Sequence, residues 1–294
     1  AVLRHSGWGV VLHTGGGLLL GAAIVLGAGV EGGVVAYQMG WVIFLAPYGV
    51  LAQPIHTAIL PELVTEAREY GLERVGTSLR WSIERMALLV VPVTAAMAAL
   101  ALPAMRTVSF GATGPEGSEV LAAAVAGLAL GLLPYSAFLL LARGYYALGD
   151  SRTPGLVALA CAAAGVAVMV VGALTAEGTA LVYMLGIGHS VAYTVGLGVL
   201  GVGLARRTGA SLWPAAIGRV VAISVVVGLA GWAVSSALLD AGSARLANLG
   251  VLAGLGLAGA GAVVLGYRLL GVRRDLTVRD TVPPPAAPAT GAAT

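Results

Sequence analysis

The sequence predicts an all-α fold, a polytopic membrane helix bundle with about eight transmembrane helices. Of its 294 residues, 59% are hydrophobic and only 10% are charged, and the mean hydropathy is +0.95. A soluble domain needs about a quarter of its residues charged to cover its surface, so most of this surface is expected to face lipid. The sixteen basic residues, all arginine, fall mainly at every second boundary between apolar runs, which is the pattern that cytoplasmic loops produce.

Eight apolar runs each reach about 20 residues, the length that an α-helix needs to cross a bilayer. In chain order the expected spans are Trp8–Val30, Val34–Leu60, Leu79–Leu102, Val120–Leu141, Pro154–Leu174, Ala180–Leu204, Ala215–Leu239 and Leu246–Leu270. The arginine-poor connections are Glu31–Gly33, Thr175–Thr179 and Asp240–Arg245, and the richer ones are Glu62–Ser78, Arg143–Thr153 and Ala205–Pro214. With Arg4 ahead of the first span, this alternation places both termini of the chain in the cytoplasm.

We expect two regions along the chain: a transmembrane bundle over residues 1–272 and a disordered cytoplasmic tail over residues 273–294. The tail opens with three arginines and continues through Pro283–Pro285 into an Ala/Pro/Thr-rich end, a composition that cannot bury a core. The chain begins with Ala1, and no cleavage site follows the first apolar run. We therefore expect a piece of a longer protein and no secretory signal peptide.

Glycines at four-residue spacing predict close helix contacts within the bundle. Gly127 with Gly131, and Gly250 with Gly254, would let neighbouring helices approach where lipid supplies no hydrophobic drive to associate. The single cysteine, Cys161, has no partner for a disulfide or a metal and is interpreted as a small packing residue.

The sequence contains no signature of enzymatic chemistry: no HExxH, CxxC, Walker A or GxSxG motif occurs. His13, His56 and His189 fall in three different spans and lack metal-ligand spacing. We therefore expect no enzyme, no cofactor and no metal. The pI of about 9.2 reflects membrane-adjacent loops, so the expected partners are membrane phospholipids and phosphate-bearing substrates, not nucleic acid.

The second expected span is interrupted by Pro47 and Pro54 and carries polar Gln53 and His56 within one turn of each other. Residues 53 and 56 share a helix face, and each proline removes a backbone hydrogen bond that neighbours or a cavity must replace inside a membrane. Two interpretations stand equally: these side chains line a hydrophilic cavity, or they form a polar contact between helices.

The stretch from Leu141 to Pro154 ends one span on the arginine-rich side and begins the next. Arg143 and Arg152 could bind phosphate through their planar guanidinium groups, or they could anchor the topology with Asp150 as a local partner. Pro154 is expected at the first position of the following helix, which proline favours.

Two motifs resemble those of the MurJ/MviN lipid II flippase family, within the MOP exporter superfamily. The first resembles a span that ends in a TxLLPxLS-like signature, and its residues here are Pro47, Gly49, Thr57 and Pro61. The second resembles the family's K/R-x-FYAxxDxxTP motif, and its residues here are Arg143, Tyr145, Tyr146, Asp150, Arg152, Thr153 and Pro154. The motifs lie about 80 residues apart with one expected span between them.

This resemblance implies the second lobe of a fourteen-helix flippase, followed by two extra helices whose groove holds the lipid tail. It implies the C-terminal portion of a transporter that moves lipid II, the undecaprenyl-diphosphate-linked peptidoglycan precursor, across the bacterial cytoplasmic (inner) membrane by alternating access. The missing N-terminal lobe would belong to the same or a separate chain. Gln53 and His56 are then expected to line the cavity, and Arg143 to contact phosphate from the inner side.

Two positions depart from the family pattern. Family members usually carry an arginine a few residues before the proline of the second span, where this chain has Val42, and some have a sodium site with an acidic residue where the surroundings of Ala22 are apolar. Two alternatives are therefore kept. One is a non-transporting membrane scaffold of cell-wall assembly, which the missing arginine favours, and the other is an exporter of another polyprenyl-linked glycan.

Overall fold

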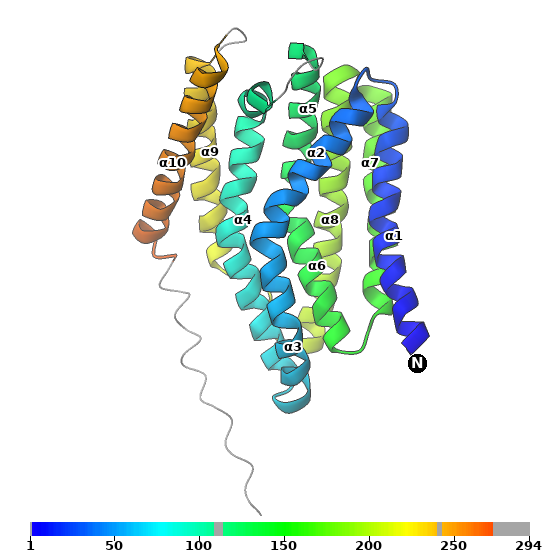
Figure 1. The fold of residues 1–294 in the computed structure, drawn as a ribbon. Coiled ribbons are helices and arrows are strands. Elements are labelled where there is room, and N and C mark those ends of the chain that lie inside the picture. The colour runs from blue at the N-terminus through cyan, green and yellow to red at the C-terminus, as the bar shows by residue number, and fades with distance from the viewer. Residues whose placement is uncertain (1, 109–113, 240–242, 273–294) are drawn as a thin grey trace, which may run out of the picture.

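The computed structural model describes residues 2–108, 114–239 and 243–272, and Figure 1 shows this part of the chain as a bundle of helices. Its elements are α1 Val2–Gly27, α2 Gly33–Pro47, the π-helical turn η1 Tyr48–Ala52, α3 Gln53–Glu69, α4 Leu72–Val108, α5 Gly114–Ala129, α6 Leu132–Ala147, α7 Arg152–Thr175, α8 Gly178–Thr208, α9 Ala216–Leu238 and α10 Arg245–Leu269. In the described residues, seven helical segments are long and apolar enough to cross a membrane, and the bent pair α5–α6 makes an eighth. The predicted all-helical bundle of about eight spans is confirmed.

The helices form one main bundle, with α9 and α10 packed against its side (Figure 1). Within the bundle α8 contacts α5, α6 and α7, and α1 packs on α7. Outside it α9 packs on α4, and α10 contacts both α9 and α4. Leu246, Leu257 and Leu269 of α10 are each at least three-quarters exposed, which suits a helix that meets lipid on most of its surface.

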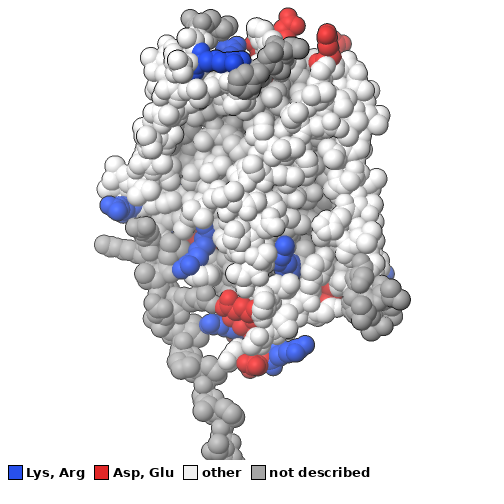
Figure 2. All heavy atoms as spheres, in the orientation of Figure 1, with Lys and Arg blue, Asp and Glu red and all other residues white. Residues whose placement is uncertain are grey.

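The bundle has two ends, which we name from Figure 1. At the lower end lie the connections α3–α4, α6–α7 and α8–α9. At the upper end lie the connections α1–α2 and α7–α8, the C-terminal ends of α4 and α9, and the N-terminal ends of α5 and α10. Figure 2 shows charged side chains gathered toward the two ends and a broad band between them that carries none. Such a band is what a protein surface in hydrocarbon requires, because uncompensated charge there is costly.

The first correction to the predicted spans concerns the connection Glu62–Ser78. Only Tyr70 and Gly71 separate α3 from α4, and Gly71 takes the left-handed conformation (φ 86°) that glycine tolerates. Hydropathy detected only the apolar parts of these helices. Their lower ends remain helical because they bury an amphipathic stripe that includes Leu63 and Val75.

The second correction concerns the fourth expected span, Val120–Leu141, which is not one continuous helix. It divides into α5 and α6, which meet at 44°. Pro134 lies in the first turn of α6, and because proline has no N–H it cannot donate to the carbonyl of Leu130. The chain therefore restarts its hydrogen-bonded helix after Gly131.

The two glycine pairs behave differently. A Cβ on Gly131 would lie 2.7 Å from the Ser190 hydroxyl, and a Cβ on Gly127 would collide with the backbone of α8 near Gly186, so the close contact predicted for this pair is confirmed. Among the described residues, nothing lies within 4 Å of a Cβ built on Gly250 or Gly254. The prediction was wrong for that pair, because spacing alone does not say which helix face meets a neighbour.

Candidate functional site

The second span is broken by a π-helical turn between two prolines. Pro47 ends α2 and Pro54 is the second residue of α3, and between them the N–H of Gln53 donates to the carbonyl of Tyr48, five residues back. Each proline removes one regular helical hydrogen bond, and the extra residue of a π turn re-aims the side chains that follow it. As a result Tyr48 and His56 meet: the Tyr48 hydroxyl lies 3.4 Å from His56 Nδ1, and the ring centroids are 5.7 Å apart.

Arg143 reaches this pair from the last turns of α6. Its Nη1 donates to the carbonyl of Leu139, 3.1 Å away, so the side chain runs back along α6 into the bundle, the direction in which helical Cα–Cβ bonds tilt. The guanidinium acts electrostatically on Tyr48, His56 and Tyr135. We call these four residues the Arg143 site.

The structure separates the two polar residues that spacing placed together. His56 is fully buried, and its Nε2 has no hydrogen-bond partner in the described part of the chain. Gln53 is exposed, as is Thr57, whose hydroxyl donates to the carbonyl of Pro54. Of the three predicted site residues, Arg143 and His56 are brought together and Gln53 lies apart. Val42 is also exposed, on α2.

A ladder of aromatic rings leads from the Arg143 site toward the middle of the bundle, and sequence reasoning missed it. Tyr135 packs against Tyr48 at 4.9 Å and against Tyr193 at 4.8 Å, and Tyr193 stands 5.3 Å from the ring of His189. The hydroxyl of Tyr37 closes the ladder at 3.0 Å from His189 Nδ1. A signal was present, because Tyr37, Trp41, Phe44 and Tyr48 follow one another at four- and three-residue steps on a single helix face.

The carboxylate of Asp150 ties the α6–α7 connection together at the lower end. It accepts hydrogen bonds from the N–H and the hydroxyl of Thr153, at 3.0 and 2.7 Å, and from Arg207 of α8 at 2.8 Å. Burial alone would raise the pKa of Asp150, but these hydrogen bonds and the Arg207 charge hold that pKa below its usual range.

The other residues of this motif have structural surroundings. Tyr145 is buried and donates to the carbonyl of Leu200 at 3.3 Å, while the guanidinium of exposed Arg152 lies 5.8 Å from the ring of Trp8. Pro154 is the third residue of α7, not the first as expected. The helix starts earlier because the Asp150 carboxylate caps its first turn.

Replacing Asp150 with alanine is expected to lower the free energy of unfolding by about 1–2 kcal/mol at pH 7, because a helix cap and a contact to α8 are lost together. The folded-state pKa lies below that of the unfolded chain, so this contribution is complete above about pH 4 and is lost as the pH falls through the lowered pKa. In detergent, the unfolding temperature of wild type should therefore exceed that of the variant at pH 7, and the two temperatures should converge in acid. Arg152→Gln is the control and should change stability by less than about 0.5 kcal/mol; an equal loss in both variants would contradict the assignment.

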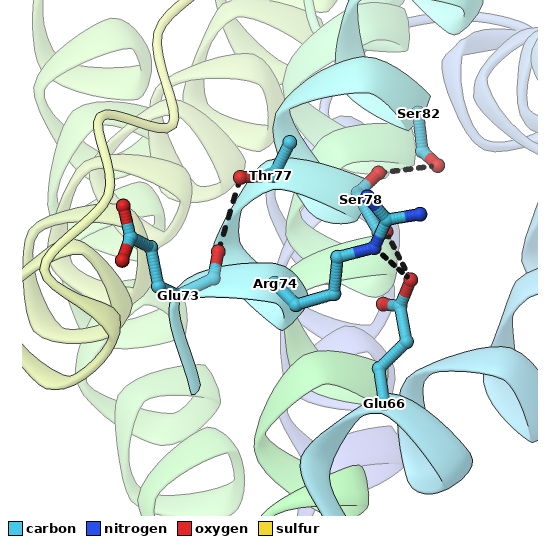
Figure 3. A network of polar contacts seen from close by, with 6 residues as sticks. All are labelled: Glu66, Glu73, Arg74, Thr77, Ser78 and Ser82. Atoms are coloured by element: carbon cyan, nitrogen blue, oxygen red, sulfur yellow. Dashed lines mark hydrogen bonds and ion pairs between the residues drawn. The ribbon is translucent and has the colours of Figure 1, made fainter. Parts of the chain in front are cut away.

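A second polar network, also missed from sequence, joins α3 to α4 (Figure 3). The carboxylate of buried Glu66 accepts from Arg74 Nε at 3.0 Å and from the Ser78 hydroxyl at 2.7 Å, and Ser82 donates to the Ser78 carbonyl. An ion pair held by additional hydrogen bonds fixes the register of two helices more firmly than an exposed pair does. This network braces the hairpin that carries His56. In the described residues, no three His, Cys, Asp or Glu side chains cluster so as to hold a metal ion.

These features define a polytopic α-helical membrane protein with a proline-broken span and a cation directed into the bundle. The family model of the lipid II flippase MurJ matches residues 24–249, which is most of the chain. The chain therefore belongs to the MurJ family of lipid II flippases.

A solved structure has the same fold. The lipid II flippase MurJ in an inward closed conformation superposes with a TM-score of 0.63 at 16% sequence identity, over 82% of this chain and 48% of that one. The present chain thus spans about half the length of the solved flippase. No curated protein matches it in sequence.

Proposed function

We propose that this chain forms the C-terminal half of a lipid II flippase, which moves the undecaprenyl-diphosphate-linked peptidoglycan precursor across the bacterial cytoplasmic membrane by alternating access. Membership of the MurJ family supports the substrate class. The order of the two motifs supports placement in the second lobe, with the N-terminal lobe on the same or another chain and both termini of the present chain in the cytoplasm.

The observation that carries the proposal is the direction of Arg143. A diphosphate crosses hydrocarbon only where the protein supplies compensating charge and hydrogen bonds. The Arg143 guanidinium bonds to Leu139 within α6 and faces the Tyr48–His56 pair. A planar guanidinium can take two phosphate oxygens at once, and His56 Nε2, which has no hydrogen-bond partner among the described residues, offers a further polar contact. We assign Arg143 to the diphosphate and His56 to the cavity wall beside it; Gln53, which is exposed and lies apart from both, is not part of this site.

The groove between α4, α9 and α10 is assigned to the polyprenyl tail. It encloses about 590 Å³ and is lined almost wholly by apolar side chains and glycines, among them Val93, Val227 and Gly259. An apolar lining of this kind accepts hydrocarbon.

The test is a strain depleted of its own flippase and supplied with the full-length protein. We expect restored growth together with restored exposure of lipid II on the outer leaflet, measured with an externally added probe. One observation favours a scaffold instead: exposed Val42 stands where the family usually carries arginine. Restored growth without lipid II exposure would favour that scaffold, and loss of a different surface glycan would favour an exporter of another polyprenyl-linked lipid.

A further inference from the structure

A second hollow lies at the upper end of the same three helices, beyond the apolar groove. It encloses about 610 Å³ and is lined by residues of α4, α5, α8, α9 and α10, a volume within the range of about 300–1,000 Å³ that small-molecule sites have. Unlike the groove, its wall carries Arg106, Glu119, Ser235 and Asn248. We call it the upper pocket.

The wall of the upper pocket contains one positive and one negative charge. Arg106 Nη2 donates to Glu119 Oε1 at 3.1 Å, and the two side chains are 23% and 48% exposed. Because neither charge is deeply enclosed, the pair exchanges readily for other partners, and such exposed pairs contribute little to stability. The pocket therefore offers a cation and an anion side by side, with no net charge.

Polar atoms without partners remain in this wall. Asn248 is 4% exposed, and among the described residues neither its Oδ1 nor the buried Arg106 Nε has a hydrogen-bond partner. A buried polar group without a partner costs about 1–3 kcal/mol, so these two atoms favour a ligand that would hydrogen-bond to them. The Arg106 Nε–H group is a donor, and the Asn248 side-chain oxygen is an acceptor.

The Ser235 hydroxyl donates its hydrogen bond to the carbonyl of Trp232, so toward a ligand it can act only as an acceptor. The pocket then holds three kinds of acceptor, on Glu119, Ser235 and Asn248, and one cation, Arg106. This set complements a headgroup that brings several N–H donors together with an anionic oxygen. Trp232, which is 57% exposed, lies in the same wall, and tryptophan is enriched at the level of lipid headgroups.

We propose that the upper pocket binds the headgroup of phosphatidylethanolamine from the leaflet at the arginine-poor end of the bundle. The phosphate takes the place of Glu119 on Arg106, and the ammonium donates to Glu119 and to the Asn248 side-chain oxygen. One acyl chain continues along α4, α9 and α10 toward the apolar groove, where it competes with the polyprenyl tail, because the two hollows follow one another on these helices. The assignment stands on this pocket alone and does not require lipid II transport.

The test is lipid binding by native mass spectrometry on the full-length protein, titrated with single phospholipids. Phosphatidylethanolamine should bind at least about tenfold more tightly than phosphatidylglycerol, which lacks the amine. It should also bind more tightly than phosphatidylcholine, whose quaternary nitrogen has no N–H to donate. Free phosphoethanolamine should bind more weakly than the lipid, because it lacks the chains.

Two variants make the assignment falsifiable. Glu119→Gln should bring the ratio of the affinities for phosphatidylethanolamine and phosphatidylglycerol close to one, and Arg106→Gln should weaken binding of both lipids. The control Arg268→Gln, an exposed arginine at the lower end of α10, should leave the ratio unchanged. Equal affinity of the wild type for the two lipids, an unchanged ratio in Glu119→Gln, or equal binding of free phosphoethanolamine would each overturn the proposal.

Discussion

Replacing Arg143 with alanine in the full-length protein is expected to abolish complementation of a flippase-depleted strain while the protein remains in the membrane at normal levels. Arg143 is the charge that the structure turns into the bundle, beside Tyr48 and His56. Losing one partner of a shielded charge contact costs about 2–5 kcal/mol, which corresponds to at least about tenfold in binding. Growth after depletion and outer-leaflet exposure of lipid II are the two measurements.

Two companion variants separate phosphate binding from topology. Arg143→Lys keeps the positive charge that orients the span but loses the planar fork, so it should insert normally and transport less than wild type. Arg152→Ala removes an exposed arginine from the same motif. It should support growth, because Arg206 and Arg207 still supply the positive charge that orients the lower end of the bundle. Normal growth of Arg143→Ala, with lipid II exposed as in wild type, would reduce Arg143 to a topology anchor.

Replacing Gly186 with alanine is expected to separate α5 from α8 and to lower the yield of folded protein sharply. A Cβ at this position would lie 2.7 Å from the backbone carbonyl carbon of Gly127 and 2.7 Å from the backbone nitrogen of Leu128. Backbone atoms cannot move aside as a flexible side chain can, so the helices themselves must shift. Overpacking of this kind typically costs about 1–3 kcal/mol or more, and thermal unfolding in detergent measures it.

Gly250→Ala is the matched control, a glycine in an apolar helix where no described residue lies within 4 Å of the added Cβ. Alanine loses less backbone entropy than glycine in a helix, so this variant should be neutral or more stable by up to about 1 kcal/mol. The contact between α5 and α8 would not be tightly packed if Gly186→Ala unfolded at the wild-type temperature. The same would follow if Gly186→Ala and Gly250→Ala lowered the unfolding temperature equally.

The class of fold was predictable because it depends on properties that add up along the chain. Apolar length and arginine placement identified the eight spans without any knowledge of contacts. The boundaries were less predictable. The lower ends of α3 and α4 are polar enough to read as a loop, yet Leu63 and Val75 hold them in helical form by packing. The break between α5 and α6 required knowing that Pro134 acts at the start of a helix, not inside one.

The candidate site was predictable only in part. Motif resemblance identified Arg143, and polarity within the second span identified His56. Helical spacing also placed Gln53 with His56, but the structure leaves Gln53 exposed. The difference follows from η1, where an irregular turn resets the helix face in a way that a fixed 100° step per residue does not reproduce. Glu66, set in a stretch expected to be a loop, gave no signal of the network that it forms with Arg74 and Ser78.

By itself, the sequence determined that this protein lies in a membrane, how many times it can cross, and to which family its motifs belong. Only the tertiary structure decided which glycines are contacts, as Gly127 and Gly131 are and Gly250 and Gly254 are not. It also decided that one arginine, Arg143, turns inward. The physical reason is that hydropathy and charge are properties of single residues summed over a segment, whereas contact and direction depend on which neighbours the folded helices place opposite each face.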